Sequence, residues 1–254
     1  MELCWIPGGT FWMGSSDGRL NEQPPHRVSI HANPGVLSEA GFWMGRFPVT
    51  QRQYAAIVPG HKNHFQANDD DPASWNRPAE QISWHDAMAF VQQLNASPTV
   101  KLPAGCILSL PSEAEWEYAC RAGTRTDFYT GDDESALRSC AWYGVNWNTG
   151  STHPVGQLFA NAWGLHDMHG NVREWCLDAW DTNAYRHRVG NAVDPLNPGS
   201  SETLRTHRGG SWLNSAGDCR SAYRSWDAPG NRVRLFGFRL ACVPGPRAPA
   251  MIQS

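Results

Sequence analysis

The sequence is poor in charge and lacks a long hydrophobic run. Its 254 residues include 21 Lys and Arg against 24 Asp and Glu, which gives a formal net charge of −3, and charged residues make up only 18% of the chain. This balance disfavours a partner bound through overall charge, such as nucleic acid. The mean hydropathy of −0.51 and the absence of an apolar stretch long enough for a bilayer predict no membrane span.

Cysteine is present without a pairing pattern. Seven residues are scattered along the chain and none forms a C-x-x-C pair. An odd number at irregular spacing argues against a disulfide framework and against a structural zinc site. The sequence therefore predicts buried free thiols, at Cys4, Cys106, Cys120, Cys140, Cys176, Cys219 and Cys242.

The first residues lack the basic and apolar segments of a secretory signal. They read Met-Glu-Leu-Cys-Trp-Ile-Pro-Gly-Gly, which suits a strand followed by a turn rather than a targeting peptide. The expected location is cytoplasmic.

Glycine, proline and tryptophan are abundant. The 24 Gly and 18 Pro residues predict many turns and short elements. The 13 Trp residues exclude disorder over most of the chain, because disordered segments have few aromatic side chains. We expect an α+β fold with small antiparallel sheets, two main helices and many ordered loops.

Capping patterns and hydrophobic periodicity locate these elements. Ser83 and Ser112 begin the two main helices, which are followed by apolar residues at helical spacing. Thr50 followed by Gln53 begins a shorter helix. The start of the chain is interpreted as a hairpin of residues 3–6 and 10–13. Three late stretches, 207–213, 220–225 and 236–243, are expected to be extended.

The pattern shows no internal repeat, and only the loops at 63–78 and 190–203 interrupt it. We therefore expect one domain over residues 1–246, with a frayed tail at 247–254.

Five segments in order resemble the formylglycine-generating enzyme (sulfatase-modifying factor) family. Each alone is a weak signal, but their order along nearly the whole chain is specific. The resemblance implies a variant of the C-type lectin fold with two helices, little regular structure and many loops. The segments are Ile6–Gly14, Pro48–Thr50, Leu110–Ala119, Gly164–Trp175, and Arg208–Trp212 with Gly237–Arg239.

The catalytic cysteines of that family do not match this sequence. The family's oxidases use two cysteine thiolates, shortly after the Arg-Gly-Gly-Ser segment, to bind copper and attack the substrate thiol. Here Asn214 stands about where the first cysteine would be, and Cys219 is alone. A soft metal needs at least two convergent soft ligands. We expect no copper and no formylglycine chemistry. The iron-dependent sulfoxide synthases of the family resemble a fusion to an additional helical domain, for which this chain has no room.

The segment from Arg208 to Arg239 resembles something narrower, the variable region of proteins diversified by diversity-generating retroelements. These systems copy a template with errors at adenines into the 3′ end of a gene. A fixed framework of arginine, glycine, cysteine and proline then alternates with interchangeable residues. We expect Arg208, Arg220, Arg224 and Arg239 to be framework residues, partly buried and hydrogen-bonded.

The residues between the framework positions mix aromatic, aliphatic and charged side chains without regular periodicity. Such mixtures are typical of adaptable binding surfaces. The opposing interpretation places Trp226 and Phe236 in the core. The excess of Arg over Asp in this part of the chain could also indicate an acidic partner, although structural arginine is the simpler explanation. The predicted ligand-binding residues are Leu213, Asn214, Ser215, Gly217, Asp218, Tyr223, Ser225, Trp226, Asp227, Gly230, Asn231, Val233, Arg234, Leu235 and Phe236.

A calcium site is implied by the same family resemblance. Asp167, Gly170, Val172 and Glu174 match a family site of two carboxylates and two backbone carbonyls, and hard oxygen ligands suit calcium. Such an ion would be structural. The alternative of zinc on His166 and His169 lacks a third ligand.

A second polar segment, with His61, His64 and residues 69–71, is better interpreted as a solvated loop than as a metal site.

These observations favour a non-enzymatic ligand-binding protein with a hypervariable C-terminal surface. Its partner would be an unidentified protein or other macromolecule. The alternative is a copper-dependent oxidoreductase of the formylglycine-generating type, or a relative with altered chemistry. A third hypothesis is a structural or regulatory adaptor domain.

Overall fold

The computed structural model describes residues 1–31, 41–188 and 190–245. The predicted tail at 247–254 lies outside them. Within these ranges no helix is both long and apolar enough to cross a lipid bilayer.

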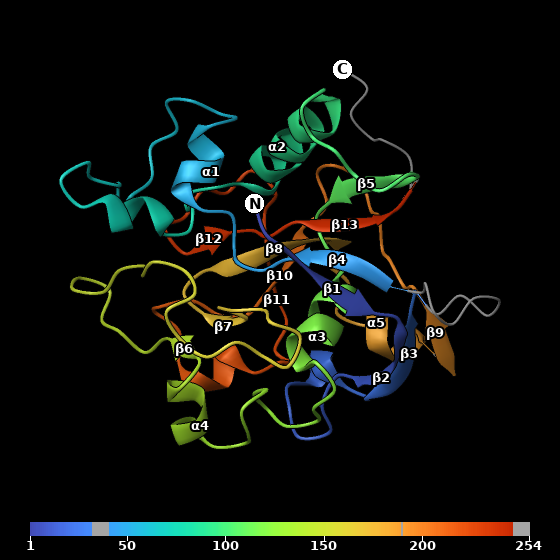
Figure 1. Ribbon diagram of the computed structural model, residues 1–254. Helices are drawn as coiled ribbons and strands as arrows, with labels where there is room; N and C mark the ends of the chain where they lie inside the picture. The colour runs from blue at the N-terminus through green and yellow to red at the C-terminus, as the bar shows by residue number, and fades with distance from the viewer. Residues whose placement is uncertain (32–40, 189, 246–254) are drawn as a thin grey trace.

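Short elements and loops dominate the described part of the chain (Figure 1). The helices are α1 (Gln51–Ala55), α2 (Trp84–Ala96), α3 (Glu113–Arg121), α4 (Glu134–Arg138) and α5 (Ala184–His187), with single 3-10 turns at Leu20–Glu22, Pro72–Asn76 and Ala216–Cys219. The strands are β1 (Leu3–Pro7), β2 (Gly9–Met13), β3 (His26–Ile30), β4 (Gly41–Gly45), β5 (Cys106–Ser109), β6 (Ala141–Trp142), β7 (His169–Gly170), β8 (Arg173–Ala179), β9 (Asn191–Val193), β10 (Arg205–Arg208), β11 (Ser225–Asp227), β12 (Phe236–Gly237) and β13 (Ala241–Pro244). The predicted α+β class with two main helices, α2 and α3, is confirmed.

The strands form small sheets with the orders β1-β4-β13-β5, β11-β10-β8-β12, β2-β3-β9 and β6-β7. Most pairs are antiparallel, as predicted, but β12 with β8, β3 with β9, and β6 with β7 are parallel. The predicted N-terminal hairpin is wrong, because β1 pairs with β4 and β2 pairs with β3. The turn at Gly8 instead carries the chain from one sheet to another.

The predicted capping boxes are all present. The side chains of Thr50, Ser83 and Ser112 each accept from the backbone N–H three residues on, and that residue's side chain accepts in return. Each box satisfies two of the donors that a helix N-terminus leaves unpaired. Sequence signals therefore located the start of all three helices.

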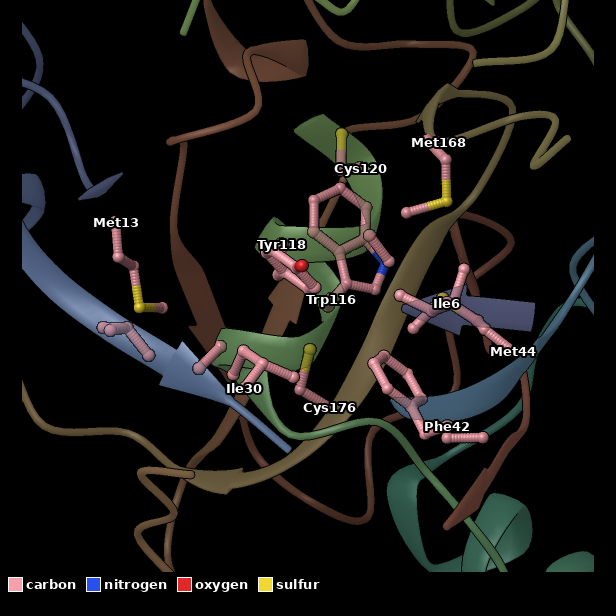
Figure 2. Close-up of a cluster of buried hydrophobic side chains, with 14 of the residues drawn as sticks. Ile6, Met13, Ile30, Phe42, Met44, Trp116, Tyr118, Cys120, Met168 and Cys176 are labelled. Atoms are coloured by element: carbon pink, nitrogen blue, oxygen red, sulfur yellow. The ribbon is translucent and has the colours of Figure 1, made fainter. Parts of the chain in front are cut away.

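Helix α3 lies inside the molecule, and all nine of its residues are buried. It contacts β2, β3, β8 and β10, so sheets approach it from different sides (Figure 1). Figure 2 shows Trp116 of this helix among Ile6, Met44 and Met168, which belong to one hydrophobic cluster. A helix buried on every side has no solvent face on which to place its charged residues.

The charged residues of α3 are instead neutralised by arginines from the C-terminal segment. Arg224 binds Glu113 through two hydrogen bonds, of 2.5 Å from Nε and 2.7 Å from Nη2. Arg208 donates to Glu117, which also pairs with Arg121 at 2.9 Å. Burial by itself would raise the pKa of Glu113 and Glu117, but these guanidinium groups outweigh it and hold both pKa values below the usual range.

We predict that Arg208→Ala destabilises the protein by about 3–5 kcal/mol, because it leaves a buried carboxylate without its partner. Trp226→Ala is the matched control, since this side chain is 47% exposed, and we expect a change under about 0.5 kcal/mol. Urea unfolding of the two variants measures both values. Equal losses would contradict a division between framework and surface.

Candidate functional site

The segment 208–239 is held in place by four arginines from within it. Arg208 and Arg224 bind α3, and both are fully buried. Arg239 binds Glu174 through two hydrogen bonds of 2.7 and 2.8 Å. Arg220 binds Glu22 through two of 2.9 Å. The predicted framework role of these arginines is confirmed, and burial is deeper than expected.

A close approach of backbone to side chain fixes the start of the same segment. Gly209 and Gly210 have φ angles of +90° and +70°, which favour glycine. A Cβ on Gly210 would lie 2.5 Å from the Cys219 sulfur. The loop is therefore anchored by packing as well as by charge.

Eleven of the fifteen predicted binding residues retain contact with solvent. Those most exposed are Ser215, Gly217, Trp226, Gly230 and Asn231. Those partly exposed are Leu213, Asp218, Ser225, Asp227, Val233 and Arg234.

The other four are buried, which corrects the expectation that they face solvent. Asn214 accepts from Arg173 at 3.0 Å and from Ser211 at 2.7 Å. Tyr223 and Leu235 are about as well covered, and Phe236 lies between Trp175 and His207. Their surroundings come from strands distant in sequence, so local pattern did not reveal their burial. For Phe236 the core interpretation is right, whereas for Trp226 it is wrong.

One part of the exposed surface combines the segment with loops outside it. The Arg234 guanidinium lies 3.6 Å from the centre of the Trp147 ring and donates to the Trp147 carbonyl at 2.7 Å. It also hydrogen-bonds His64 at 2.8 Å. Trp147 is 46% exposed. Sequence reasoning missed Trp147 and His64 as surface partners, because only the fold brings their loops to residue 234.

A second part of the surface faces the N-terminal loop. Asp218 pairs with Arg19 at 2.9 Å, and the Arg19 guanidinium lies 4.6 Å from the centre of the Tyr223 ring. The exposed Trp226 stands on β11 at the edge of its sheet. The exposed residues therefore meet different fixed neighbours rather than forming one uniform face.

The thiols do not provide the site that copper needs. Cys219 is fully buried, and burial raises its pKa to about 12. Asn214 occupies the neighbouring stretch without a sulfur. Cys106 and Cys242 are adjacent on β5 and β13, but Cys242 is buried in a hydrophobic cluster. In the described ranges no group of three His, Cys, Asp or Glu side chains is placed to hold a metal ion. The residues present do not fit copper.

We predict that Cys120 and Cys219 resist a thiol reagent at neutral pH in the folded protein, because burial raises both pKa values to about 12 and the thiolate is the reactive form. Cys4 and Cys106 are partly exposed and should react first. Labelling followed by peptide mass mapping identifies the order. Fast labelling of Cys219 before unfolding would contradict its burial.

The carboxylates matched to calcium already have partners. Glu174 accepts from Arg239 through both oxygens and from Trp116 at 2.7 Å. Asp167 accepts from the Gly156 N–H at 2.8 Å and from Asn171 at 3.2 Å, and burial raises its pKa. A buried guanidinium already neutralises one of the two carboxylates, so the side chains do not form an open ligand set.

The alternative zinc histidines are separated by their hydrogen bonds. Nδ1 of His169 contacts the Cys219 carbonyl at 2.7 Å, whereas that of His166 contacts the Leu158 carbonyl at 2.8 Å. Each ring is thus engaged by a different backbone segment.

We expect calcium to leave the melting temperature unchanged relative to EDTA, because Arg239 supplies the positive charge at Glu174. Differential scanning calorimetry in the two buffers checks this. A calcium-dependent rise of several degrees, abolished by Asp167→Asn, would restore the calcium site.

A model of the sulfatase-modifying factor enzyme 1-like domain matches residues 1–243. The chain belongs to this family. A formylglycine-generating enzyme of Thermomonospora curvata is 32% identical, over 94% of this chain and 92% of that protein. The predicted family and its C-type lectin-like fold are confirmed.

Two further likenesses bear on function. A solved structure, Treponema denticola variable protein 1, superposes with a TM-score of 0.78 at 28% identity and covers 94% of both chains. This agrees with the narrower resemblance to variable proteins. The serine/threonine-protein kinase Pkn1 of Chlamydia trachomatis is 28% identical over 94% of this chain, but the match spans only 38% of that protein's length.

Proposed function

We propose that this chain is a non-enzymatic ligand-binding protein that displays a variable C-terminal surface, diversified by a retroelement. Its ligand would be a protein or another macromolecule. The family match and the likeness to a variable protein support this proposal.

One observation carries the proposal: within residues 208–239, buried ion-paired arginines alternate with exposed side chains. Arg224 is 1% exposed, whereas Trp226, two residues on, is 47% exposed. Asn231 and Arg232 are exposed, and Arg239 is again fully buried. Substitutions at the exposed positions would change contacts with a ligand without removing an anchor.

Rigidity gives such a surface an energetic advantage. A loop that is ordered before binding avoids the loss of conformational entropy that a flexible loop incurs, typically about 0.5–1.5 kcal/mol for each immobilised side chain. The arginine anchors, the glycine pair and the buried residues Asn214, Tyr223, Leu235 and Phe236 supply this order. The exposed residues that remain as the proposed binding surface are the eleven named above.

Family membership favours the alternative of an oxidase. That reaction would require a reactive thiol pair, whereas Cys219 is buried and Asn214 stands where a sulfur is needed. The enzyme hypothesis predicts copper- and oxygen-dependent consumption of a cysteine-containing peptide, abolished by Cys219→Ala. We expect no turnover from either protein.

We predict that a display library randomised at Trp226, Asn231, Val233 and Arg234 retains folding and yields binders to an arbitrary soluble protein such as lysozyme. The reason is that surface substitutions typically cost less than about 0.5 kcal/mol. A matched library at Asn214, Tyr223, Leu235 and Phe236 should mostly unfold. Display level and binding are read together by cell sorting.

Two outcomes would count against the proposal. The first is equal loss of folding in both libraries. The second concerns the coding locus, which should carry a reverse transcriptase and a near-identical copy of the 3′ end that differs at adenines. Absence of both would remove the retroelement.

A further inference from the structure

A cavity of 750 Å³ lies outside the variable segment, beside the N-terminal loop that follows β2. Among the residues that line it are Trp12, Asp17, Arg125, Asp127 and Asp132. The Trp12 ring is 42% exposed. An aromatic face and several carboxylates therefore open onto one hollow.

Two of these carboxylates are forced together by a tight turn. Phe128 and Gly131 exchange both backbone hydrogen bonds, of 2.9 and 3.0 Å. Asp127 and Asp132 are the next pair outward, and the Asp127 N–H donates to the Asp132 side chain at 2.9 Å. Side chains directly opposite in such a pair stand about 5 Å apart at Cβ, and like charges there are unfavourable. A cation beside them would relieve this repulsion.

Most of the arginines around the cavity are already neutralised. Arg19 pairs with Asp218, Arg121 with Glu117, and Arg220 with Glu22. Only Asp127 shares any of this charge, at 3.9 Å from Arg220.

Within the described part of the chain, Asp17, Asp132 and Arg125 form no ion pair. With Asp127, the carboxylates therefore outnumber the one uncommitted guanidinium. Burial raises the pKa of Asp127, and the neighbouring Asp132 adds to the rise.

We propose that this cavity binds a basic side chain, lysine or arginine, of the macromolecular ligand. The cation lies against the Trp12 ring, where the face of an indole attracts positive charge. Asp127 and Asp132 pair with it from the opposite wall, and Asp17 adds to the negative field. The ligand class rests on the proposed binding function, but the cavity's preference for a cation does not.

The cavity is coupled to the variable segment through one ion pair. Asp218 neutralises Arg19, which lines the cavity. A different residue at 218 would release the Arg19 charge and weaken attraction for a cation. Variation at this position therefore adjusts a site that the variable segment does not itself form.

The direct test is calorimetric titration of the folded protein with N-acetyl-arginine amide at low ionic strength. N-acetyl-glutamine amide and N-acetyl-glutamate amide are the neutral and anionic probes. We expect the arginine probe to bind about tenfold more tightly than either, and salt to weaken it, because the interaction is electrostatic and partly exposed.

Variants locate the site. Asp127→Asn with Asp132→Asn should reduce affinity for the arginine probe about tenfold, and Trp12→Ala about fivefold, in line with a surface cation–π contact. Asp218→Asn should reduce it less. The controls are Asp70→Asn, an exposed carboxylate on another loop, and Trp226→Ala, an exposed indole elsewhere. Melting temperatures verify that every variant is folded.

The outcomes separate the two proposals. A cavity with no preference for arginine, or one whose affinity survives the double aspartate substitution, overturns the cation site and leaves the display surface standing. Preference for the glutamate probe would assign the cavity to an anion held by Arg125 and would equally overturn it. Cation binding without any binder from the library described above would retain the site and remove the display function.

Discussion

The structure depends on the neutralisation of carboxylates that α3 carries into the interior. Glu113 and Glu117 are buried with the helix, and their partners Arg208 and Arg224 come from the far end of the chain. Removing either side of such a pair leaves a charge without solvent, which is strongly unfavourable. The same interactions that make the interior tolerable therefore fix the position of the C-terminal segment.

This coupling explains how one segment can be both immobile and permissive. Its arginines point inward to α3, Glu174 and Glu22, and the residues between them reach the surface. Because the anchors are polar and directional, they hold the backbone without requiring large apolar side chains at every second position. The exposed positions are then free of structural duties, except where a fixed loop contacts them, as Trp147 contacts Arg234.

The fixed neighbours give the surface properties that substitution within the segment does not alter. Trp147 and His64 provide an aromatic support on one side, and the cavity beside Trp12 provides carboxylates on another. A ligand would meet a chemically constant surround and a changing centre. The absence of an accessible thiol pair in the described part of this surface distinguishes it from an oxidase site built on the same fold.

The sequence alone determined the helix starts at Thr50, Ser83 and Ser112, the family and the framework role of the four arginines, because capping and ordered motifs are properties of neighbouring residues. It did not determine strand partners, so the expected hairpin of β1 and β2 was wrong. Nor did it separate Phe236, buried, from Trp226, exposed, since both are aromatic and lie in the same irregular segment. Pairing, burial and the cavity depend on contacts between residues far apart in the chain, and only the tertiary structure decides those.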